Sequence, residues 1–240
     1  MSSKYKIRGF SNPLLPTKAV ALYIFTSSFL FLITSCTHDA DQYKIHGIDV
    51  SHYQRTIDWR TVAKQEKVHF VFIKATESID YQDSMFQKNW EGAKEAGLIR
   101  GAYHFFRPNV SVEWQIKNFT QQVELEKGDL PPVLDIEDFK NVTMPTLIER
   151  VRLWLIFIEE HYQVRPIIYA SLNVYEKHLQ AAFSEYPVWI ARYNRTVPPK
   201  NTNWIFWQYS DYTTMDGVLG NVDKNVFGGS LSELEALCLD

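Results

Sequence analysis

The chain has 240 residues, of which 15% are aromatic and 22% are charged, so its length suits one barrel-sized domain or two small domains. Four of the 25 Lys and Arg residues lie in residues 1–35, whereas all 28 Asp and Glu residues follow, so residues 36–240 carry a formal charge of −7. This charge argues against nucleic acid as a partner, because nucleic-acid binding needs a basic surface.

The N-terminal residues have the features of an export signal. Ala19 to Thr34 is an apolar run of 16 residues behind a basic leader, which is short for a membrane span and typical of a signal-peptide core. The run ends at Ile33-Thr34-Ser35-Cys36, which resembles a bacterial lipobox, so residues 1–35 are predicted to form a signal peptide and Cys36 to carry lipid. The alternatives are an uncleaved anchor, or an ordinary signal peptide with an incidental cysteine. Residues 36–43 are polar and are expected to form a short tether, and Cys238 alone gives no disulfide framework.

Residues 44–240 alternate short apolar strands with helical segments, which predicts βα units around a parallel sheet. Five strands that each lead into a helix come first: Ile45–His52, His69–Glu77, Ile99–Phe106, Leu130–Asp138 and Arg165–Ser171. Their helices are predicted at Ile57–Lys67, Met85–Ala96, Val112–Glu126, Thr146–His161 and Asn173–Leu179. Three strands nearly without helices follow at Tyr186–Tyr193, Trp204–Ser210 and Gly220–Asn225, before a short helix at Leu231–Leu237. The pattern predicts an irregular TIM-like α/β barrel, (β/α)5(β)3, with its functional residues at the C-terminal ends of the strands.

The fourth strand carries two acidic residues at its end. Pro131 and Pro132 prevent a helix and favour an extended backbone. Side chains alternate along a strand, so Asp135 and Glu137 point the same way. Two neighbouring carboxylates repel each other, which should raise the pKa of one of them, and such a pair suits an acid and a partner carboxylate acting at one bond. The alternative is a surface edge or a helix N-cap.

Polar or aromatic residues also lie at or near the ends of the other strands. They are Asp49, Lys74, Tyr103, His104, Tyr169, Trp189, Trp207, Gln208 and Asp223. Lys74 is expected to pair with an acid across the barrel mouth, to contact a ligand, or to extend to solvent. Tyr103 and His104 point to opposite faces, so only one of them can line a central site.

Nine segments together resemble the family 25 glycoside hydrolases, which are lysozymes of the muramidase type. The segments are Gly47-Ile48-Asp49-Val50-Ser51, Tyr53-Gln54, Ile57-Asp58-Trp59, Phe72-Ile73-Lys74-Ala75-Thr76-Glu77, Gly101-Ala102-Tyr103-His104-Phe105, Asp135-Ile136-Glu137, Trp189-Ile190-Ala191-Arg192-Tyr193, Trp207-Gln208-Tyr209 and Val222-Asp223-Lys224-Asn225. Each segment is a weak signal, but all of them occur in the family's order. Arg55 and Ser78 depart from the pattern, since glycine is common at both positions in the family.

The resemblance implies cleavage of the β-1,4 bond between N-acetylmuramic acid and N-acetylglucosamine in peptidoglycan. It implies that Glu137 is the general acid and that Asp135 orients the 2-acetamido group of the substrate, in a retaining, substrate-assisted reaction. Asp49 and Asp223 are implied to be further acids of the cleft. A ring of carboxylates is expected to keep Glu137 protonated near neutral pH.

The resemblance also implies how substrate is held. The expected substrate-binding residues are Lys74, Tyr103, Tyr169, Trp189, Tyr193, Trp207 and Gln208. The expected partners are peptidoglycan glycan strands and, through lipidated Cys36, a membrane of the bacterial cell envelope, with secretion as the alternative. A monomer is taken as the default, and no cofactor or metal is expected.

Two other function classes remain open. A lipid-anchored module that binds peptidoglycan without cutting it would have no need to retain Glu137. A metal-dependent amidase or deacetylase could use Asp49, His52 or His104, but no His pair has metal-ligand spacing near a third ligand.

Overall fold

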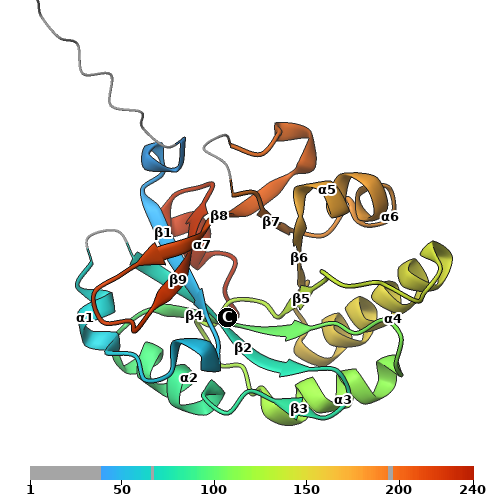
Figure 1. Ribbon diagram of the computed structural model, residues 1–240, viewed down its shortest axis with the longest axis horizontal. Helices are drawn as coiled ribbons and strands as arrows, with labels where there is room; N and C mark the ends of the chain where they lie inside the picture. The colour runs from blue at the N-terminus through green and yellow to red at the C-terminus, as the bar shows by residue number, and fades with distance from the viewer. Residues whose placement is uncertain (1–38, 66–67, 194–196) are drawn as a thin grey trace, which may run out of the picture. The chain divides into compact units, whose positions relative to one another are not determined.

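Eight strands close into a barrel in the computed structural model, which describes residues 39–65, 68–193 and 197–240 (Figure 1). These strands are β1 (Ile45–Val50), β2 (Val68–Glu77), β4 (Ile99–Phe105), β5 (Val133–Asp135), β6 (Ile167–Ser171), β7 (Val188–Ala191), β8 (Trp204–Thr214) and β9 (Asn221–Phe227). Strand β1 pairs with both β2 and β9 and so closes the barrel, while the short strand β3 (Tyr81–Gln82) adds to the end of β2. The predicted irregular α/β barrel is confirmed.

Helices follow the first five barrel strands, as the sequence predicts. They are α1 (Trp59–Ala63), α2 (Phe86–Glu95), α3 (Val112–Gln122), α4 (Met144–Tyr162) and, after β6, α5 (Leu172–Val174), the π-helical turn η3 (Tyr175–Leu179) and α6 (Gln180–Phe183). Side chains cap several N-termini, among them Asp58 on α1, Ser111 on α3 and Thr143 on α4. After β7 and β8 the described residues contain only the 3-10 turn η4 (Lys200–Thr202), and α7 (Leu231–Glu235) ends the chain. Strand β9 runs antiparallel to both neighbours because it returns directly from β8 without a crossover helix.

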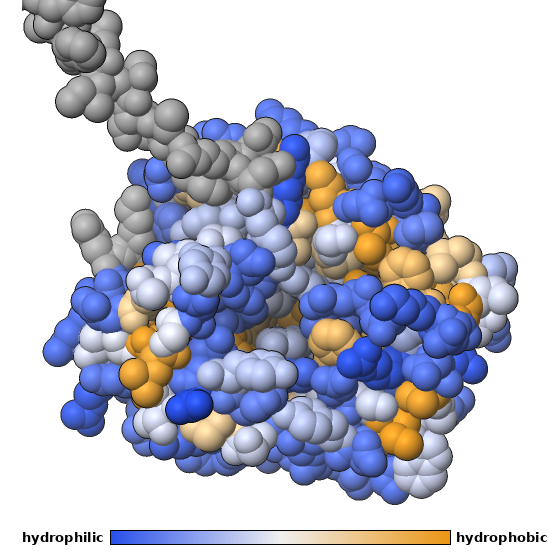
Figure 2. Space-filling view, viewed as in Figure 1, coloured by the Kyte–Doolittle hydropathy of each residue, from blue (hydrophilic) through white to orange (hydrophobic). Residues whose placement is uncertain are grey.

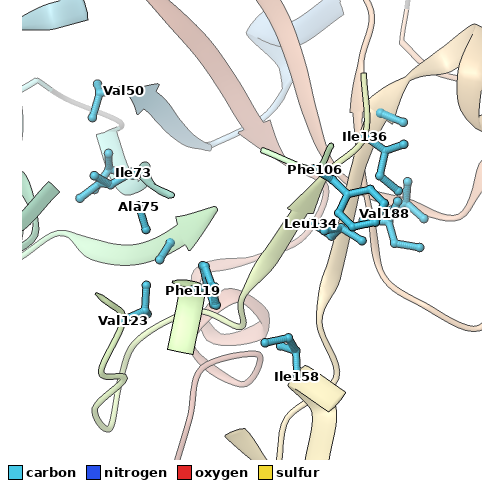
Figure 3. Packing of buried hydrophobic residues seen from close by; sticks show 14 of the residues in the cluster. Val50, Ile73, Ala75, Phe106, Phe119, Val123, Leu134, Ile136, Ile158 and Val188 are labelled. Atoms are coloured by element: carbon cyan, nitrogen blue, oxygen red, sulfur yellow. The ribbon is translucent and has the colours of Figure 1, made fainter. Parts of the chain in front are cut away.

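Strand alternation separates two apolar layers. One layer lies between strands and helices, and Figure 3 shows part of it, with Ile73 and Leu134 from the strands and Phe119 and Ile158 from α3 and α4. The other fills the barrel itself and is rich in aromatic rings, with the Phe72 and Trp189 rings stacked at 4.4 Å. The inward-facing residues of each strand therefore lead from this aromatic filling up to the polar residues at the strand ends.

Gly47 and Gly101 make room for the aromatic filling. A Cβ on Gly47 would lie 2.5 Å from the Phe70 ring, and one on Gly101 would lie 2.7 Å from the Phe72 ring. Neither distance is compatible with normal contact, so the two glycines are required by the large side chains of β2.

The described part of the expected tether packs on the barrel. Ala40 in the 3-10 turn η1 (Asp39–Gln42) is fully buried, and the Tyr43 ring meets the Trp204 ring edge-on at 5.6 Å. Asp39 Oδ2 accepts a hydrogen bond from the Val197 backbone at 2.9 Å. The expected signal peptide, residues 1–35, and Cys36 lie outside the described residues.

The surface around the barrel is mixed in character. On the face shown in Figure 2 hydrophilic residues predominate, and hydrophobic residues gather in the region of α5 and α6. Within the described ranges, no helix combines the length and the apolar character needed to cross a membrane.

Candidate active site

A pocket of about 230 Å³ opens where the parallel strands end. It is lined by Asp49, Val50, Ser51, Tyr53, Gln54, Lys74, Tyr103, Phe105, Asp135, Glu137, Tyr169, Trp189, Tyr193, Gln208 and Asp223. The structure thus brings together the four predicted acids and six of the seven predicted binding residues. They reach one pocket because each lies on the inward-facing side of its strand or just beyond its end.

Asp135 and Glu137 project into this pocket from the end of β5. The strand ends at Asp135, but the Ile136 amide donates to the Tyr169 carbonyl at 3.0 Å, which keeps the backbone extended and directs Glu137 inward. Asp135 is only 4% exposed, and its Oδ1 has no hydrogen-bond partner among the described residues. A buried carboxyl oxygen without a donor is costly unless a bound ligand supplies one.

Burial is the main influence on the acidity of this pair. It raises the pKa of Asp135 well above its usual value, and the neighbouring Glu137 charge raises it further. Glu137 is exposed at the pocket, but partial desolvation by its surroundings raises its pKa as well, whereas its hydrogen bond with Asp135 and the charge of Lys74 lower that pKa. The expectation that surrounding carboxylates raise the pKa of Glu137 was therefore wrong in its cause, because desolvation has this effect.

Asp49 and Asp223 form a second pair on the opposite, antiparallel side of the barrel. Asp49 Oδ2 accepts hydrogen bonds from Asn225 Nδ2 at 2.7 Å and Gln208 Nε2 at 2.8 Å. Burial raises the pKa of Asp49 to about 6, and burial together with the Asp49 charge raises the pKa of Asp223 to about 8. The pair therefore keeps one shared proton near neutral pH, and the two amide donors on Asp49 favour the charged form of Asp49 and hence the proton on Asp223.

Gln208 connects this acid pair to two tyrosines. Its Oε1 accepts hydrogen bonds from the hydroxyls of Tyr169 at 2.7 Å and Tyr193 at 2.8 Å. The amide is thereby oriented so that Nε2 donates to Asp49 and, at 3.3 Å, to Asp223. Gln208 thus has two functions: it donates hydrogen bonds to both acids, and it lines the pocket.

Asn225 is a site residue that was not predicted from the sequence. Besides donating to Asp49, it accepts a hydrogen bond through Oδ1 from Trp189 Nε1 at 2.8 Å. The available signal was its position two residues after Asp223 on one strand, which places both side chains on the same face.

Lys74 pairs with an acid, but this acid does not lie across the barrel mouth as one expected alternative stated. The partner is Glu77, at 2.7 Å and near the end of the same strand. Arg107 holds the other oxygen of Glu77, through Nε at 3.0 Å and Nη2 at 2.7 Å. Lys74 also lies 4.8 Å from the centre of the Phe105 ring, so ion pairing and a cation–π contact fix the cation beside the pocket. Neither Glu77 nor Arg107 was predicted from the sequence to be a site residue.

Of the two adjacent residues Tyr103 and His104, Tyr103 faces the pocket. His104 points outward to the helices, where its ring nitrogens contact Thr76 Oγ1 at 2.7 Å and Gln115 Oε1 at 3.1 Å. Burial lowers the pKa of His104 to about 4. His104 therefore cannot join Asp49 at a common metal, and the described residues contain no cluster of three or more potential metal ligands.

Trp207 does not reach the pocket, in contrast to its predicted role as a substrate wall. It is 0% exposed and packs with Ala40 and Val226 outside the barrel, where Nε1 donates to the Arg192 carbonyl at 2.9 Å. The physical reason is alternation along β8, since Gln208 faces inward and its neighbour must then face outward.

The two departures from the family pattern occupy unusual backbone conformations. Arg55 and Ser78 both have φ of 55°, a region that glycine enters without steric cost. The backbone that a glycine commonly provides is thus retained here with two larger residues.

Comparisons with known proteins agree with this arrangement. The family model described as "Glycosyl hydrolases family 25" matches residues 48–218. YegX of Escherichia coli (strain K12) is 44% identical over 199 residues, covering 81% of this chain and 73% of its own length. Lysozyme M1 of Streptomyces globisporus is 36% identical over 220 residues, covering 82% of this chain and 72% of its own length.

A solved structure shows the same fold. The family 25 glycosyl hydrolase from Bacillus anthracis superposes with a TM-score of 0.77 at 32% identity, covering 86% of this chain and 100% of that chain. The chain therefore belongs to glycosyl hydrolase family 25 and is a glycoside hydrolase of the lysozyme class.

Proposed function

We propose that the chain is an N-acetylmuramidase that hydrolyses the β-1,4 bond between N-acetylmuramic acid and N-acetylglucosamine in peptidoglycan. In this proposal Glu137 is the general acid and base, and Asp135 orients the 2-acetamido group of the muramic acid unit. The family and the relatives named lysozyme support the substrate class, and the pairing of buried Asp135 with the accessible Glu137 beside it supports the two roles.

The observation that carries the proposal is the unpartnered Oδ1 of buried Asp135. An acetamido N–H is a donor of the kind this oxygen lacks. Its approach would stabilise the charged form of Asp135, so the proton that the pair shares would lie on Glu137, where the leaving oxygen needs it. Substrate binding itself would thus complete the general acid.

The reaction then proceeds in two steps. The acetamido oxygen attacks the anomeric carbon and forms an oxazolinium ring, while the glycosidic C–O bond breaks and Glu137 transfers its proton to the leaving O4. Water next attacks the anomeric carbon, the ring opens, and the Glu137 carboxylate accepts the proton of that water. Two displacements at one carbon retain the β configuration.

Asp49 and Asp223 would bind substrate on the other side of the pocket. The protonated Asp223 can donate a hydrogen bond to a sugar oxygen, whereas Asp49 is committed to Asn225 and Gln208. Lys74, Tyr103, Tyr169, Trp189 and Tyr193 would complete the walls of the site. Trp207 is left out because it lies behind the sheet.

The test is digestion of purified peptidoglycan by the wild type and by Glu137→Gln, with product ends read by mass spectrometry. The wild type should release muropeptides with reducing muramic acid ends, and Glu137→Gln should lower the rate by about 10²–10⁴-fold, since an isosteric amide cannot donate the proton. Glu95→Gln is the matched control, because Glu95 is exposed on α2 and does not line the pocket.

Two results would contradict the proposal. Reducing glucosamine ends would place the cut at the other bond. Equal tight binding by wild type and Glu137→Gln, without any cleavage, would support the alternative of a catalytically silent peptidoglycan-binding protein.

We also propose that the protein is exported and held in the cell envelope through lipidated Cys36, with secretion as the alternative. The support is the lipobox-like sequence that ends at Cys36, together with a substrate that lies outside the cytoplasm. Peptidoglycan strands are the proposed partner, and a monomer is the proposed state.

A further inference from the structure

An exposed tyrosine ring lies at the rim of the pocket. Tyr53 is 77% exposed, yet it belongs to the residues that line the pocket together with Glu137 and Asp223. A large ring left in water next to a sugar-cleaving site is poorly explained by packing. Aromatic rings of this kind offer a flat apolar face and a polar edge to a ligand.

The backbone that carries Tyr53 is held in place by a compact turn. Ser51 Oγ accepts a hydrogen bond from the Tyr53 amide at 3.3 Å, and Gln54 Oε1 accepts one from the Ser51 amide at 2.9 Å. Gln54 Nε2 donates to the Asn221 carbonyl at 3.0 Å and so joins the turn to the start of β9. The exposed ring is therefore presented from a fixed platform, and less conformational entropy is lost when it binds a ligand.

A histidine supports the Tyr53 ring from one side. The rings of His52 and Tyr53 lie 4.2 Å apart with an angle of 34° between their planes. His52 Nδ1 lies 2.8 Å from Oδ2 of the buried Asp83, which also accepts from the His52 amide at 3.0 Å, and the Tyr81 hydroxyl is 3.0 Å from the same Nδ1. These contacts to Asp83 and Tyr81 fix the orientation of the His52 ring against which Tyr53 packs.

We propose that Tyr53 is a stacking subsite for a sugar unit of the glycan strand that lies outside the pocket, next to the unit at the cleaved bond. This inference rests on the proposed function, because a polymeric glycan must continue past the pocket. The apolar face of an N-acetylhexosamine ring stacks on Tyr53, and His52 and Asp83 are positioning residues that fix the ring. Continuity with the catalytic pocket favours the glycan over a protein partner.

The test measures binding in the Glu137→Gln background of the full-length chain, so that no substrate is consumed. The probe is a glycan strand freed of its stem peptides, compared with the disaccharide repeat alone. Tyr53→Ala should weaken strand binding about fivefold to tenfold and affect the disaccharide less, and Tyr53→Phe should restore strand affinity to within twofold because the ring face remains. Tyr212→Ala is the control, since Tyr212 is 81% exposed but does not line the pocket.

The positioning role of Asp83 has a separate readout. Asp83→Asn should raise KM for long strands more than it lowers kcat, whereas a loss of fold would lower the melting temperature and the apparent kcat and leave KM unchanged. Unchanged strand binding by Tyr53→Ala, or an equal loss in Tyr212→Ala, would overturn the subsite. Absence of cleavage by the wild type would instead overturn the proposed function, while the effect of Tyr53 on strand binding would still be measured.

Discussion

At the scale of single residues, the pocket combines two carboxyl pairs in different environments. Asp135 and Glu137 lie near the cations Lys74 and Arg107, which favour ionisation of Glu137. Asp49 has two amide donors, whereas its partner Asp223 has the weaker 3.3 Å contact with Gln208 and lies near the negative charges of Asp49, Asp211 and Glu137. The second pair thus holds its proton to a higher pH than an ordinary carboxyl does.

This proton affinity predicts the pH dependence of stability. The pKa of Asp223 is about 8 in the folded protein, above its unfolded value, so its contribution to stability is complete below about pH 4 and is lost as the pH rises through 8. Asp223→Asn removes the negative charge, which burial and the neighbouring acids make unfavourable in the folded protein. We compare the free energy of unfolding of Asp223→Asn with that of wild type at each pH. This difference should favour the variant by about 1 kcal/mol more at pH 9 than at pH 4. The value is smaller than the full pKa shift implies, because Asp223 is half-buried and solvent screens its charge.

Urea unfolding of both proteins from pH 4 to pH 9 measures this difference. The exposed Asp80→Asn variant is the control and should show no such dependence. A constant difference between Asp223→Asn and wild type across the range would show that Asp223 does not hold a proton in the folded state.

Much of the candidate site was predictable from sequence, because side chains alternate between the two faces of a strand. Alternation does not say which of two neighbouring residues faces inward, and this explains what the sequence left wrong or open. Asp135 and Glu137 are two residues apart and share a face, whereas Trp207 and Gln208 are adjacent and cannot both face the pocket. The pattern alone did not say which of Tyr103 and His104 faces inward. The partners Gln208 and Asp49 are separated by 159 positions, so their hydrogen bond depends on barrel closure and is not evident from local sequence.

At the scale of elements, each expected strand and helix is present, but several ends differ. The helix expected to reach Glu126 ends at Gln122, because Val123 takes an extended conformation. The strand expected to span Leu130–Asp138 pairs only from Val133 to Asp135, since the chain then leaves the sheet to form the pocket. Such ends are set by tertiary contacts more than by local propensity.

The aromatic filling of the barrel makes a prediction about β1 and β2. Gly47→Ala should lower the free energy of unfolding by about 2 kcal/mol, because the new Cβ would overlap the Phe70 ring. Urea denaturation measures the loss. The double variant Gly47→Ala/Phe70→Leu should lose less than the sum of the two single variants, since the smaller side chain relieves the overlap. Strictly additive losses would mean that Gly47 is not needed for this contact.

At the scale of the whole molecule, two parts are distinguished, a predicted export segment at the N-terminus and a barrel that begins at β1. The sequence indicates the first from its apolar run and the second from its strand and helix pattern. It did not indicate that residues 39–43 pack against Val197 and Trp204, because these contacts join segments far apart in the chain.

The proposed anchor predicts a difference between the two cysteines. The wild type should fractionate with membranes and incorporate labelled fatty acid, whereas Cys36→Ser should do neither, because it lacks the thiol that accepts lipid. Cys238→Ser is the matched control and should behave as wild type, since Cys238 is partly buried behind α7. Labelled Cys36→Ser protein in the membrane fraction would contradict lipidation at Cys36.

The central claim is that the acetamido group held by Asp135, and not a direct attack by water, displaces the leaving sugar. The most direct measurement is proton NMR of the products within the first minutes of glycan cleavage, before the reducing ends mutarotate. The account predicts that the β-anomer of the new muramic acid end appears first and that the α-anomer follows at the rate of mutarotation. The α-anomer appearing first would show a single inverting displacement by water and would contradict the assigned role of Asp135.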